Sequence, residues 1–271
     1  MTTNKPVALV TGASSGIGKA TALALVEAGY DVVGTSRDAA KAAPLRGVSF
    51  IDLDVASDES VTAAVERVIE RSGRIDVLVN NAGFGSGGAA EESSLAQDQR
   101  VFDINVFGVL RMTKAVLPHM RSRGGGRIVN ISSIVGFIPM PYMAVYAASK
   151  HAIEGYSESL DHEVREYGVR VLLVEPAWTS TSFEANAAQP DRPLPIYAQR
   201  RRAFEQQMAK AVKDGDDPAT VAKAVVEAAT DTKPKLRYPA GAQTGRVHTM
   251  RRLVPSRLFD RQIRKLNGLP A

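Results

Sequence analysis

The sequence predicts an α/β fold: a doubly wound, mostly parallel sheet of about seven strands with helices on both faces. Short β-branched runs alternate with longer stretches of helical periodicity along the chain. Most of these runs are continuously apolar, which is typical of strands covered on both faces. The strand candidates are 7–10, 31–36, 48–53, 75–80, 127–132, 169–175 and 235–239, and the helix candidates are 16–29, 57–72, about 94–121, about 142–167 and 217–230.

Each element is bounded by residues that start or stop it. The first strand, VALV, leads directly into a glycine-rich turn and the first helix. Ser57 suits the N-cap of the second helix better than Asp54 does, although Asp54 remains an alternative. The run GGG at 124–126 forms a turn after the third helix. The last strand candidate, KLRYP, closes the far edge of the sheet.

We expect a single Rossmann-type domain over residues 1–271. No internal repeat beyond the strand–helix alternation and no low-complexity linker divides the chain. The segment 185–200 carries three prolines and the run NAAQP, which indicates a loop or lid. We assign 182–215 as a substrate lid, a kind of segment that often orders on binding, and 240–271 as a basic C-terminal extension.

Composition narrows the classes of function. The absence of cysteine excludes disulfides, thiolate catalysis and cysteine metal sites. The four histidines, at 119, 151, 162 and 248, are scattered, so we expect no metal. The first residues lack a basic start followed by a long apolar run, and no stretch of about 18 apolar residues occurs. We therefore expect a cytoplasmic protein.

The run TGASSGIG lies where a strand ends and a helix begins, which is the context that makes a glycine motif informative. Gly12 permits a sharp turn, Gly16 lets the backbone approach a pyrophosphate, and Gly18 allows close packing of helix and strand. The helix N-terminus presents free N–H groups and the positive end of its dipole. Ser14 and Ser15 add hydroxyl donors. The alternative is a strand-to-helix turn that binds nothing.

The end of the second strand bears on which dinucleotide is bound. This strand ends in GTSRD, with Thr35 and Ser36 where an acidic residue normally holds the ribose 2′-hydroxyl. Arg37 would pair with a 2′-phosphate through charge-assisted hydrogen bonds. The alternative is that Arg37 is a solvated surface residue and Asp38 binds the ribose. We favour NADP(H) over NAD(H).

Tyr146 and Lys150 are four residues apart in YAASK, so both side chains lie on one face of a helix. An ammonium beside a phenol stabilises the phenolate and lowers the pKa of the phenol. Such a tyrosine can exchange a proton with a carbonyl or alcohol oxygen near neutral pH. Ser133 follows a strand at the sheet edge where ligands bind. Taken singly, the pair is common on ordinary helices and the serine suits a simple turn.

Taken together, these motifs resemble the short-chain dehydrogenase/reductase family over roughly residues 5 to 240. The matching stretches are TGASSGIG, DLDV, NNAG at 80–83, Asn105, ISS ending at Ser133, and YAASK. The resemblance implies that Tyr146 donates or accepts the proton and that Lys150 binds the nicotinamide ribose. It implies that Ser133 binds the substrate oxygen and that Asn105 holds a water linking Lys150 to solvent. Asn105 as a kinked-helix residue is the alternative.

The resemblance also implies cofactor contacts. Asp54 and Val55 would contact the adenine, and Asn81, Ala82 and Gly83 would line the adenosine side, unless NNAG is merely a strand end with a turn. The predicted cofactor-binding set is Gly12, Ser14, Ser15, Gly16, Ile17, Gly18, Arg37, Asp54, Val55, Asn81, Ala82, Gly83, Tyr146, Lys150, Pro176, Thr179 and Thr181.

One position departs from the family pattern. Ala177 follows Pro176 where the family usually has glycine. Because alanine restricts φ, the loop after the sixth strand is expected to take a slightly different path. The choice between Thr179 and Thr181 as a cofactor ligand stays open.

The predicted activity is that of an NADP(H)-dependent carbonyl reductase or alcohol dehydrogenase. Hydride passes between the nicotinamide and a carbonyl carbon, and the protein orients the cofactor and tunes the acid. The alternatives are an NADP(H)-binding redox sensor without turnover and a sugar-nucleotide epimerase, although the latter's glycine spacing and polar substrate domain are missing. An apolar substrate is favoured by the candidate pocket residues Ile134, Val135, Phe137, Ile138, Met140, Tyr142, Met143, Trp178 and Phe183.

The last residues mix Arg and Lys with apolar residues at helical spacing, interrupted by Pro255. We favour a helix packed on its own domain with a solvated basic face. The alternatives are a helix resting on an anionic membrane or covering the substrate mouth. No recognition motif for nucleic acid accompanies the charge. The family resemblance implies a homodimer or homotetramer formed through the helices at 94–121 and 142–167.

Overall fold

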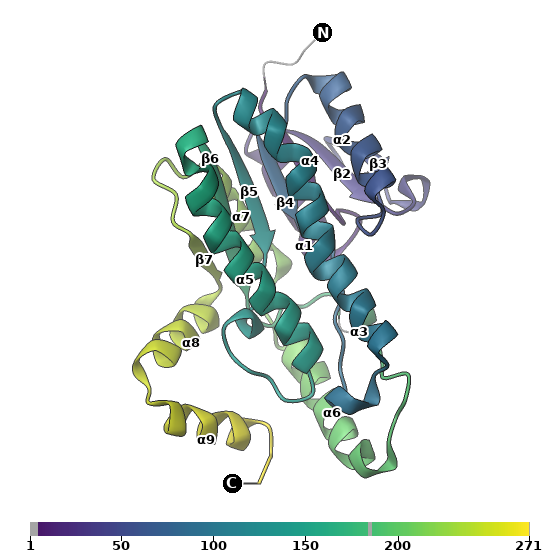
Figure 1. Ribbon diagram of the computed structural model, residues 1–271, viewed down its shortest axis with the longest axis vertical. Coiled ribbons are helices and arrows are strands. Elements are labelled where there is room, and N and C mark those ends of the chain that lie inside the picture. Colours follow the sequence, from purple (N-terminus) through teal and green to yellow (C-terminus); the bar gives the residue numbers. More distant parts are fainter. Residues whose placement is uncertain (1–4, 184–185, 271) are drawn as a thin grey trace.

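Seven parallel strands form a single twisted sheet in the computed structural model, which describes residues 5–183 and 186–270 (Figure 1). The strand order is β3-β2-β1-β4-β5-β6-β7, and every neighbouring pair is parallel. The predicted doubly wound sheet is therefore confirmed. The strands are β1 (Val7–Val10), β2 (Asp31–Ser36), β3 (Val48–Asp52), β4 (Val77–Asn80), β5 (Gly126–Ile131), β6 (Val169–Pro176) and β7 (Arg237–Ala240).

Helices cover both faces of the sheet because the strands are apolar on both sides. The apolar core on one face takes residues from α2, α4 and α5, and the core on the other face takes residues from α1 and α7. The helices are α1 (Gly16–Glu27), α2 (Asp58–Ser72), α3 (Leu95–Phe102), α4 (Gly108–Ser122), α5 (Ala144–Val164), α6 (Ala198–Lys213), α7 (Pro218–Thr230), α8 (Ala242–Leu253) and α9 (Ser256–Leu266).

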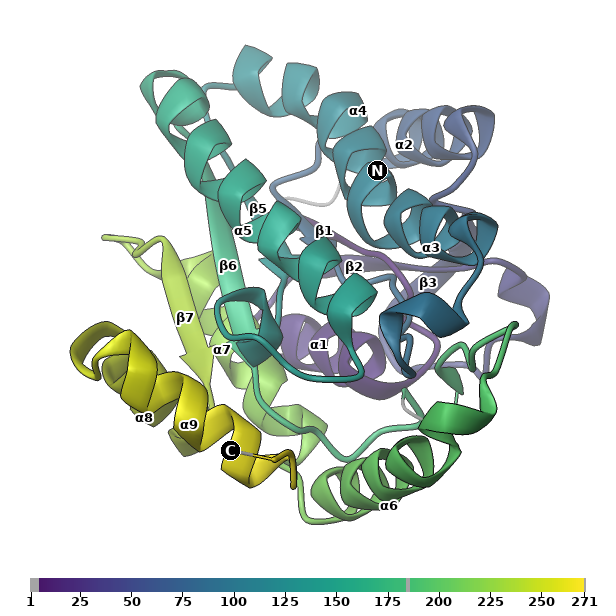
Figure 2. The same cartoon turned by 60° about the horizontal axis from the view of Figure 1, so that its bottom comes forward.

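The chain reverses its direction of winding between β1 and β4. The first three strands build outward from β1 to β3, and the next four build outward from β4 to β7 on the other side. In an open parallel sheet, ligands bind beyond the carboxyl ends of the strands at such a switch point. Figures 1 and 2 show α6, α8 and α9 gathered beyond this end of the sheet.

The single helix expected over 94–121 is interrupted. A turn of π-helix, Asp103–Phe107, separates α3 from α4. In this turn the Asn105 side chain donates from Nδ2 to the carbonyl of Phe84 (2.9 Å) and accepts the Phe84 N–H at Oδ1 (3.0 Å). The loop after β4 is thereby fixed to the helix. Single π turns occur frequently at functional sites.

Other boundaries follow local signals. Ser57 caps α2 by accepting the Ser60 N–H at 3.1 Å, as expected, whereas Asp54 accepts the Ala56 N–H at 2.9 Å. Ala177 is not among the described residues with positive φ, so its replacement of glycine imposes no left-handed strain. Half of the expected lid is the helix α6, and Pro255 separates α8 from α9. No described helix is both long and apolar enough to span a bilayer.

Candidate active site

A cavity of about 1030 Å³ opens at the carboxyl ends of the strands. Its walls come from the glycine turn, the ends of β2, β4 and β5, helix α5 and the loop after β6. Every residue of the predicted cofactor-binding set lines this cavity, and so does Ser133. Asn105 does not line it, although its neighbour Ile104 does. The fold thus brings distant motifs of the sequence together around one space.

The glycine turn has the conformation that the sequence required. Gly12 and Gly16 have φ values of +65° and +51°, which favour glycine. A Cβ at Gly18 would lie 2.2 Å from the Gly12 carbonyl oxygen and 2.5 Å from Nδ2 of Asn81. Ser15 is the N-cap of α1, but its side chain forms no capping hydrogen bond. The bare helix N-terminus and this hydroxyl suit a diphosphate.

The NNAG segment braces this turn as well as lining the cavity. Asn81 donates from Nδ2 to the carbonyl oxygens of Thr11 (2.9 Å) and Gly12 (3.2 Å). The Thr11 hydroxyl oxygen accepts the N–H groups of Asn81 and Ala82, each at 2.9 Å. The turn is therefore held in shape by the residues that directly follow β4.

The two charged residues after β2 have different surroundings. Arg37 lines the cavity together with Thr35 and Ser36. Asp38 is committed elsewhere, because it accepts the Lys41 N–H at 3.3 Å and pairs with the Lys41 ammonium at 2.8 Å. It is also not among the cavity-lining residues. A phosphate on the ribose would meet a guanidinium here.

Helix α5 places Tyr146 and Lys150 on the cavity wall, and both are buried. The Lys150 ammonium lies 5.7 Å from the centre of the Tyr146 ring and donates to the Ile131 carbonyl at 2.8 Å. Burial lowers the pKa of Lys150 from 10.5 to about 8, against an opposing effect of the Glu154 charge. Lys150 therefore exchanges its proton much more readily than an exposed lysine does.

Ser133 stands at the end of β5 as the N-cap of a short 3₁₀ turn, Ile134–Gly136. Its hydroxyl oxygen accepts the Val135 N–H at 3.3 Å, so its own proton can be donated into the cavity. Asn105 has a different place. Its side chain is taken up by Phe84 and by Ser149 at 3.3 Å, behind the cavity wall. The water-holding role of Asn105 stays a prediction.

The candidate substrate pocket is apolar, as its residues suggested. Val135, Met143, Trp178 and Phe183 line the cavity. The Phe183 ring lies 5.8 Å from the Tyr146 ring, centre to centre. The other five predicted pocket residues, Ile134, Phe137, Ile138, Met140 and Tyr142, belong to the same apolar cluster without lining the cavity. Phe204 of α6 and Phe259 of α9 complete this cluster, which the sequence did not reveal.

The lid is attached through a buried carboxylate. Glu92 accepts the N–H groups of Leu194 (2.8 Å) and Ala89 (3.1 Å) and forms an ion pair with Arg201. Just before the lid, Thr181 lies over the glycine turn, because a Cβ built on Gly16 would be 3.4 Å from the Thr181 Cβ. Thr179 donates its hydroxyl proton to the Ala177 carbonyl at 3.2 Å. Thr181 is therefore the better placed of the two to reach a diphosphate.

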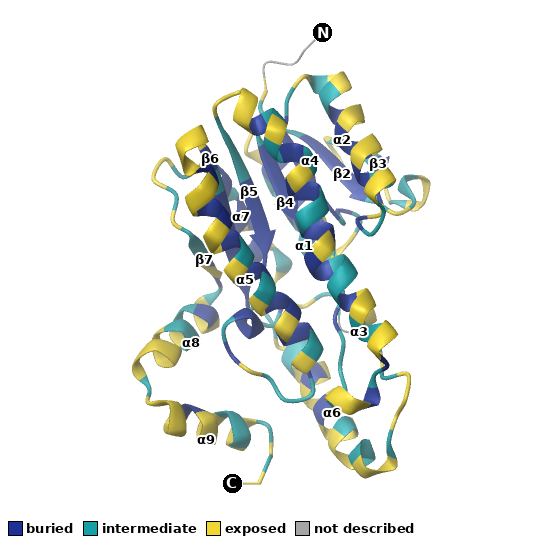
Figure 3. Ribbon diagram, viewed as in Figure 1, coloured by how far each residue is buried: buried dark blue, intermediate teal, exposed yellow. Residues whose placement is uncertain are grey.

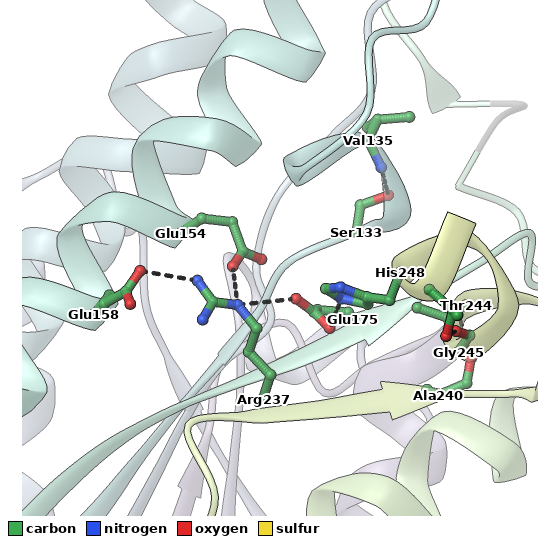
Figure 4. Close-up of polar contacts among 11 residues, drawn as sticks. Ser133, Val135, Glu154, Glu158, Glu175, Arg237, Ala240, Thr244, Gly245 and His248 are labelled. Carbon is green, nitrogen blue, oxygen red and sulfur yellow. Dashed lines mark hydrogen bonds and ion pairs between the residues drawn. The ribbon is translucent and has the colours of Figure 1, made fainter. Parts of the chain in front are cut away.

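A cluster of charged residues around two buried glutamates lies beside α5 and was not expected from the sequence (Figure 4). Arg237 contacts Glu154 at 3.1 Å and Glu175 at 3.4 Å, and His248 of α8 contacts Glu175 at 2.6 Å. The His248 ring stacks on Phe137 at 3.8 Å. Burial raises the pKa of both Glu154 and Glu175. Repulsion by Glu175 raises the pKa of Glu154 further, whereas the Arg237 charge and a hydrogen bond with Glu154 oppose the shift at Glu175. The described residues contain no cluster of His, Asp and Glu suited to a metal.

We expect this cluster to make the folded protein less stable as pH rises. Both carboxyls have pKa values raised from 4.5 to about 7, so the folded state binds more protons than the unfolded chain between pH about 4.5 and about 7. The associated stabilisation is present at low pH and is lost as pH rises through about 7. Between pH 5 and 8, Glu175→Gln should gain roughly 1–3 kcal/mol of unfolding free energy relative to the wild type.

Denaturant unfolding at several pH values measures this difference. Glu158→Gln is the matched control, because Glu158 also contacts Arg237 (3.1 Å) but is half exposed. Parallel stability curves for the wild type and Glu175→Gln would contradict the assignment.

Comparison with known proteins places the chain among one group of enzymes. A family profile described as short chain dehydrogenase matches residues 6–192. The chain is 47% identical over 180 residues to a 3-ketodihydrosphingosine reductase of Bacteroides thetaiotaomicron, a match that spans 66% of each chain, just under two thirds. It is 34% identical over 277 residues to the uncharacterized oxidoreductase YusZ of Bacillus subtilis, covering 97% of this chain and 98% of that one. It is 38% identical over 249 residues to retinol dehydrogenase 8 of Homo sapiens, covering 84% and 79%.

Solved structures similar to this chain belong to the same family. A short-chain dehydrogenase from Streptomyces avermitilis superposes with a TM-score of 0.84 at 36% identity, covering 99% of both chains. A relative from Burkholderia phymatum in complex with NAD gives 0.79 at 28% identity, covering 97% of this chain and 96% of that one. One from Burkholderia cenocepacia in complex with NADP gives 0.77 at 25% identity, covering 96% and 98%. A nicotinamide cofactor is thus common to these two neighbours, whereas its 2′-phosphate is not.

Proposed function

The chain belongs to the short-chain dehydrogenase family of oxidoreductases, and we propose that it moves hydride between NADP(H) and an apolar carbonyl or alcohol substrate. One observation carries the proposal: Ser133, Tyr146 and Lys150 line the same cavity as the braced glycine turn. Tyr146, the neighbouring Lys150 and the backbone of the glycine turn therefore border the same cavity. If each motif had only a structural role, the presence of all of them around one cavity would be a coincidence.

The chain's own residues would supply the proton chemistry. Bound NADPH supplies the hydride in carbonyl reduction. Tyr146 donates its proton to the carbonyl oxygen as that oxygen becomes an alcohol, and Ser133 donates a hydrogen bond to the same oxygen. The Lys150 ammonium stabilises the phenolate that Tyr146 leaves behind. In alcohol oxidation the same groups act in reverse.

Arg37 supports NADP(H) as the cofactor. We expect Arg37→Ala to lower kcat/KM for NADPH by about 10–100-fold, because a charge-assisted hydrogen bond to a phosphate contributes roughly 1.5–3 kcal/mol. The value for NADH should change little. Lys41→Ala is the matched control, since Lys41 is a nearby exposed cation that pairs with Asp38. Initial rates with NADPH and with NADH measure the two values of kcat/KM. A wild-type protein that uses NADH as well as NADPH would contradict the proposed role of Arg37.

The apolar cavity wall supports a hydrophobic substrate. Val135, Met143, Trp178 and Phe183 present no charge to the space beside Tyr146. A ketodihydrosphingosine and a retinol, the molecules in two relatives' names, also carry long apolar portions. NADPH oxidation across a panel of aldehydes and ketones tests this, with apolar ketones expected to react faster than sugars. Faster turnover of sugars would contradict the proposal.

Two further expectations accompany the proposal. Residues 182–215 would close over the substrate, with Glu92 as their attachment. Two copies would pair through α4 and α5, near which Phe107 and Tyr167 are large exposed side chains. A redox sensor without turnover is the competing function, and it predicts NADPH binding with no substrate-dependent oxidation of NADPH.

A further inference from the structure

The C-terminal extension carries more than the whole net positive charge of the protein. Between 240 and 271 there are seven basic residues and one acidic residue, Asp260, which gives a net charge of +6. The whole chain has a net charge of +5, so the other residues, 27 basic and 28 acidic, sum to −1. The basic residues are Arg246, Arg251, Arg252, Arg257, Arg261, Arg264 and Lys265.

This charge is not neutralised by nearby carboxylates. In the part of the chain that the structure describes, none of the seven basic residues forms an ion pair. Arg251 lies 4.9 Å above the Phe259 ring, and Arg264 donates to the Pro270 carbonyl at 2.7 Å. The extension therefore presents a concentrated positive surface.

Helix α9 is fixed beside the lid by one apolar edge and by its C-terminal end. Phe259 is 5% exposed and packs, with Ile263, into the apolar cluster that also contains Tyr146. Helix α6 holds the far end of α9, because Arg200 donates to the Gly268 carbonyl at 2.6 Å and Gln207 donates to the Leu266 carbonyl at 3.1 Å. Figure 2 shows α9 pointing toward α6 at the end of the sheet where the cavity opens.

The rest of the apolar surface of the extension faces outward. Leu253, Leu258 and Leu266 are 73%, 57% and 59% exposed. Leu258 and Leu266 are about two helical turns apart and therefore lie on the same side of α9, next to the buried stripe. Figure 3 shows both α8 and α9 as largely exposed. Exposed leucines among unpaired arginines make a surface that is both apolar and cationic.

We propose that α8 and α9 form a docking surface for an anionic lipid bilayer. Leucines at the edge of an amphipathic helix insert at the level of the headgroups, while flanking Arg and Lys attract anionic lipid. A second copy of the chain would bring one surface of charge +6 against another, and a nucleic acid would leave the leucines unused. This revises the expectation from sequence, which favoured a packed helix with a merely solvated basic face. The inference rests on this surface and does not require the proposed reaction.

Sedimentation of the full chain with lipid vesicles tests the inference. We expect binding at least about tenfold tighter to vesicles with roughly a third phosphatidylglycerol than to pure phosphatidylcholine. Binding should weaken as salt is raised, because the attraction is screened. Equal affinity for the two kinds of vesicle, or no binding to either, would overturn the inference.

Substitutions distinguish the effect of the α8–α9 surface on vesicle binding from the effect of the protein's total charge. The triple variant Arg257→Gln, Arg261→Gln, Lys265→Gln and the double variant Leu258→Ser, Leu266→Ser should each lose about tenfold or more in affinity for anionic vesicles. The matched control is Arg46→Gln, Arg67→Gln, Lys223→Gln, which removes three exposed charges from the loop before β3, from α2 and from α7. It should bind like the wild type, and an equal loss in the control would overturn the inference.

Two competing partners have distinct outcomes. If duplex DNA binds more tightly than anionic vesicles, or if the Leu258→Ser, Leu266→Ser variant dissociates an existing oligomer without changing vesicle binding, the inference is wrong. Unfolding temperature and NADPH affinity should be unchanged in all three variants, since none of these positions lines the cavity. Loss of vesicle binding with NADPH affinity retained therefore distinguishes this inference from the proposed function.

Discussion

Tyr146→Phe is expected to lower kcat by roughly 10²–10⁴-fold, the range that a positioned general acid contributes. The substitution removes only the hydroxyl, which carries the proton in the proposed reaction. The ring keeps its place against Phe183 and near Lys150, so the fold and the cavity should be unaffected. Steady-state rates of NADPH oxidation with an apolar ketone measure the effect.

Measurements of NADPH binding and of a control variant show whether the lower kcat of Tyr146→Phe is a loss of catalysis or a loss of cofactor binding. NADPH affinity should stay within about threefold of the wild type, because differential loss of kcat marks an interaction made in the transition state. Tyr156→Phe is the matched control, since Tyr156 is a second tyrosine on α5, is partly buried and does not line the cavity. Full turnover by Tyr146→Phe would refute the catalytic assignment, and the competing sensor function predicts no turnover even in the wild type.

Gly18→Ala is expected to weaken NADPH binding by at least about 100-fold and to lower stability by roughly 1–3 kcal/mol. The added Cβ would lie 2.2 Å from the Gly12 carbonyl oxygen, which is backbone, so the phosphate-binding turn itself must shift. Because Asn81 braces the same turn, its hydrogen bonds to Thr11 and Gly12 are disturbed too. Fluorescence titration with NADPH and denaturant unfolding measure the two effects.

Gly155→Ala provides the matched control for that substitution. Gly155 is inside α5, and a Cβ there meets no atom within 4 Å. Alanine is the better helix former, so this variant should gain roughly 0.5–1 kcal/mol and bind NADPH normally. If Gly18→Ala bound NADPH as tightly as Gly155→Ala, the glycine turn would not be the diphosphate site.

The sheet was predictable because its signal is local. Continuously apolar runs such as VALV and VLLV indicate burial on both faces without reference to distant residues. The glycine turn was predictable for the same reason, since positive φ at Gly12 and Gly16 is a requirement of the backbone. The contacts that hold the turn in place were not predictable, because they depend on Asn81, which follows β4 and is 70 residues away from Thr11 along the chain.

Features that depend on tertiary partners were missed. The π turn at 103–107 follows from the pairing of Asn105 with Phe84, which periodicity does not reveal. Helix α6 buries only Phe204 and Met208, so its pattern was too polar to indicate a helix. The cluster around Glu175 forms only when β6, β7 and α8 meet. An acidic residue at the end of the apolar run VLLVE was the one available signal for it.

Transfer of deuterium tests the central claim most directly. The protein is incubated with NADPH that carries deuterium in place of both hydrogens at C4 of the nicotinamide and with the best ketone from the panel, and the alcohol is analysed by mass spectrometry. Direct hydride transfer in a cavity whose proton comes from Tyr146 predicts one deuterium on the carbinol carbon with the wild type and almost no labelled alcohol with Tyr146→Phe. Alcohol formed without deuterium, or labelled equally by the two proteins, would contradict the account.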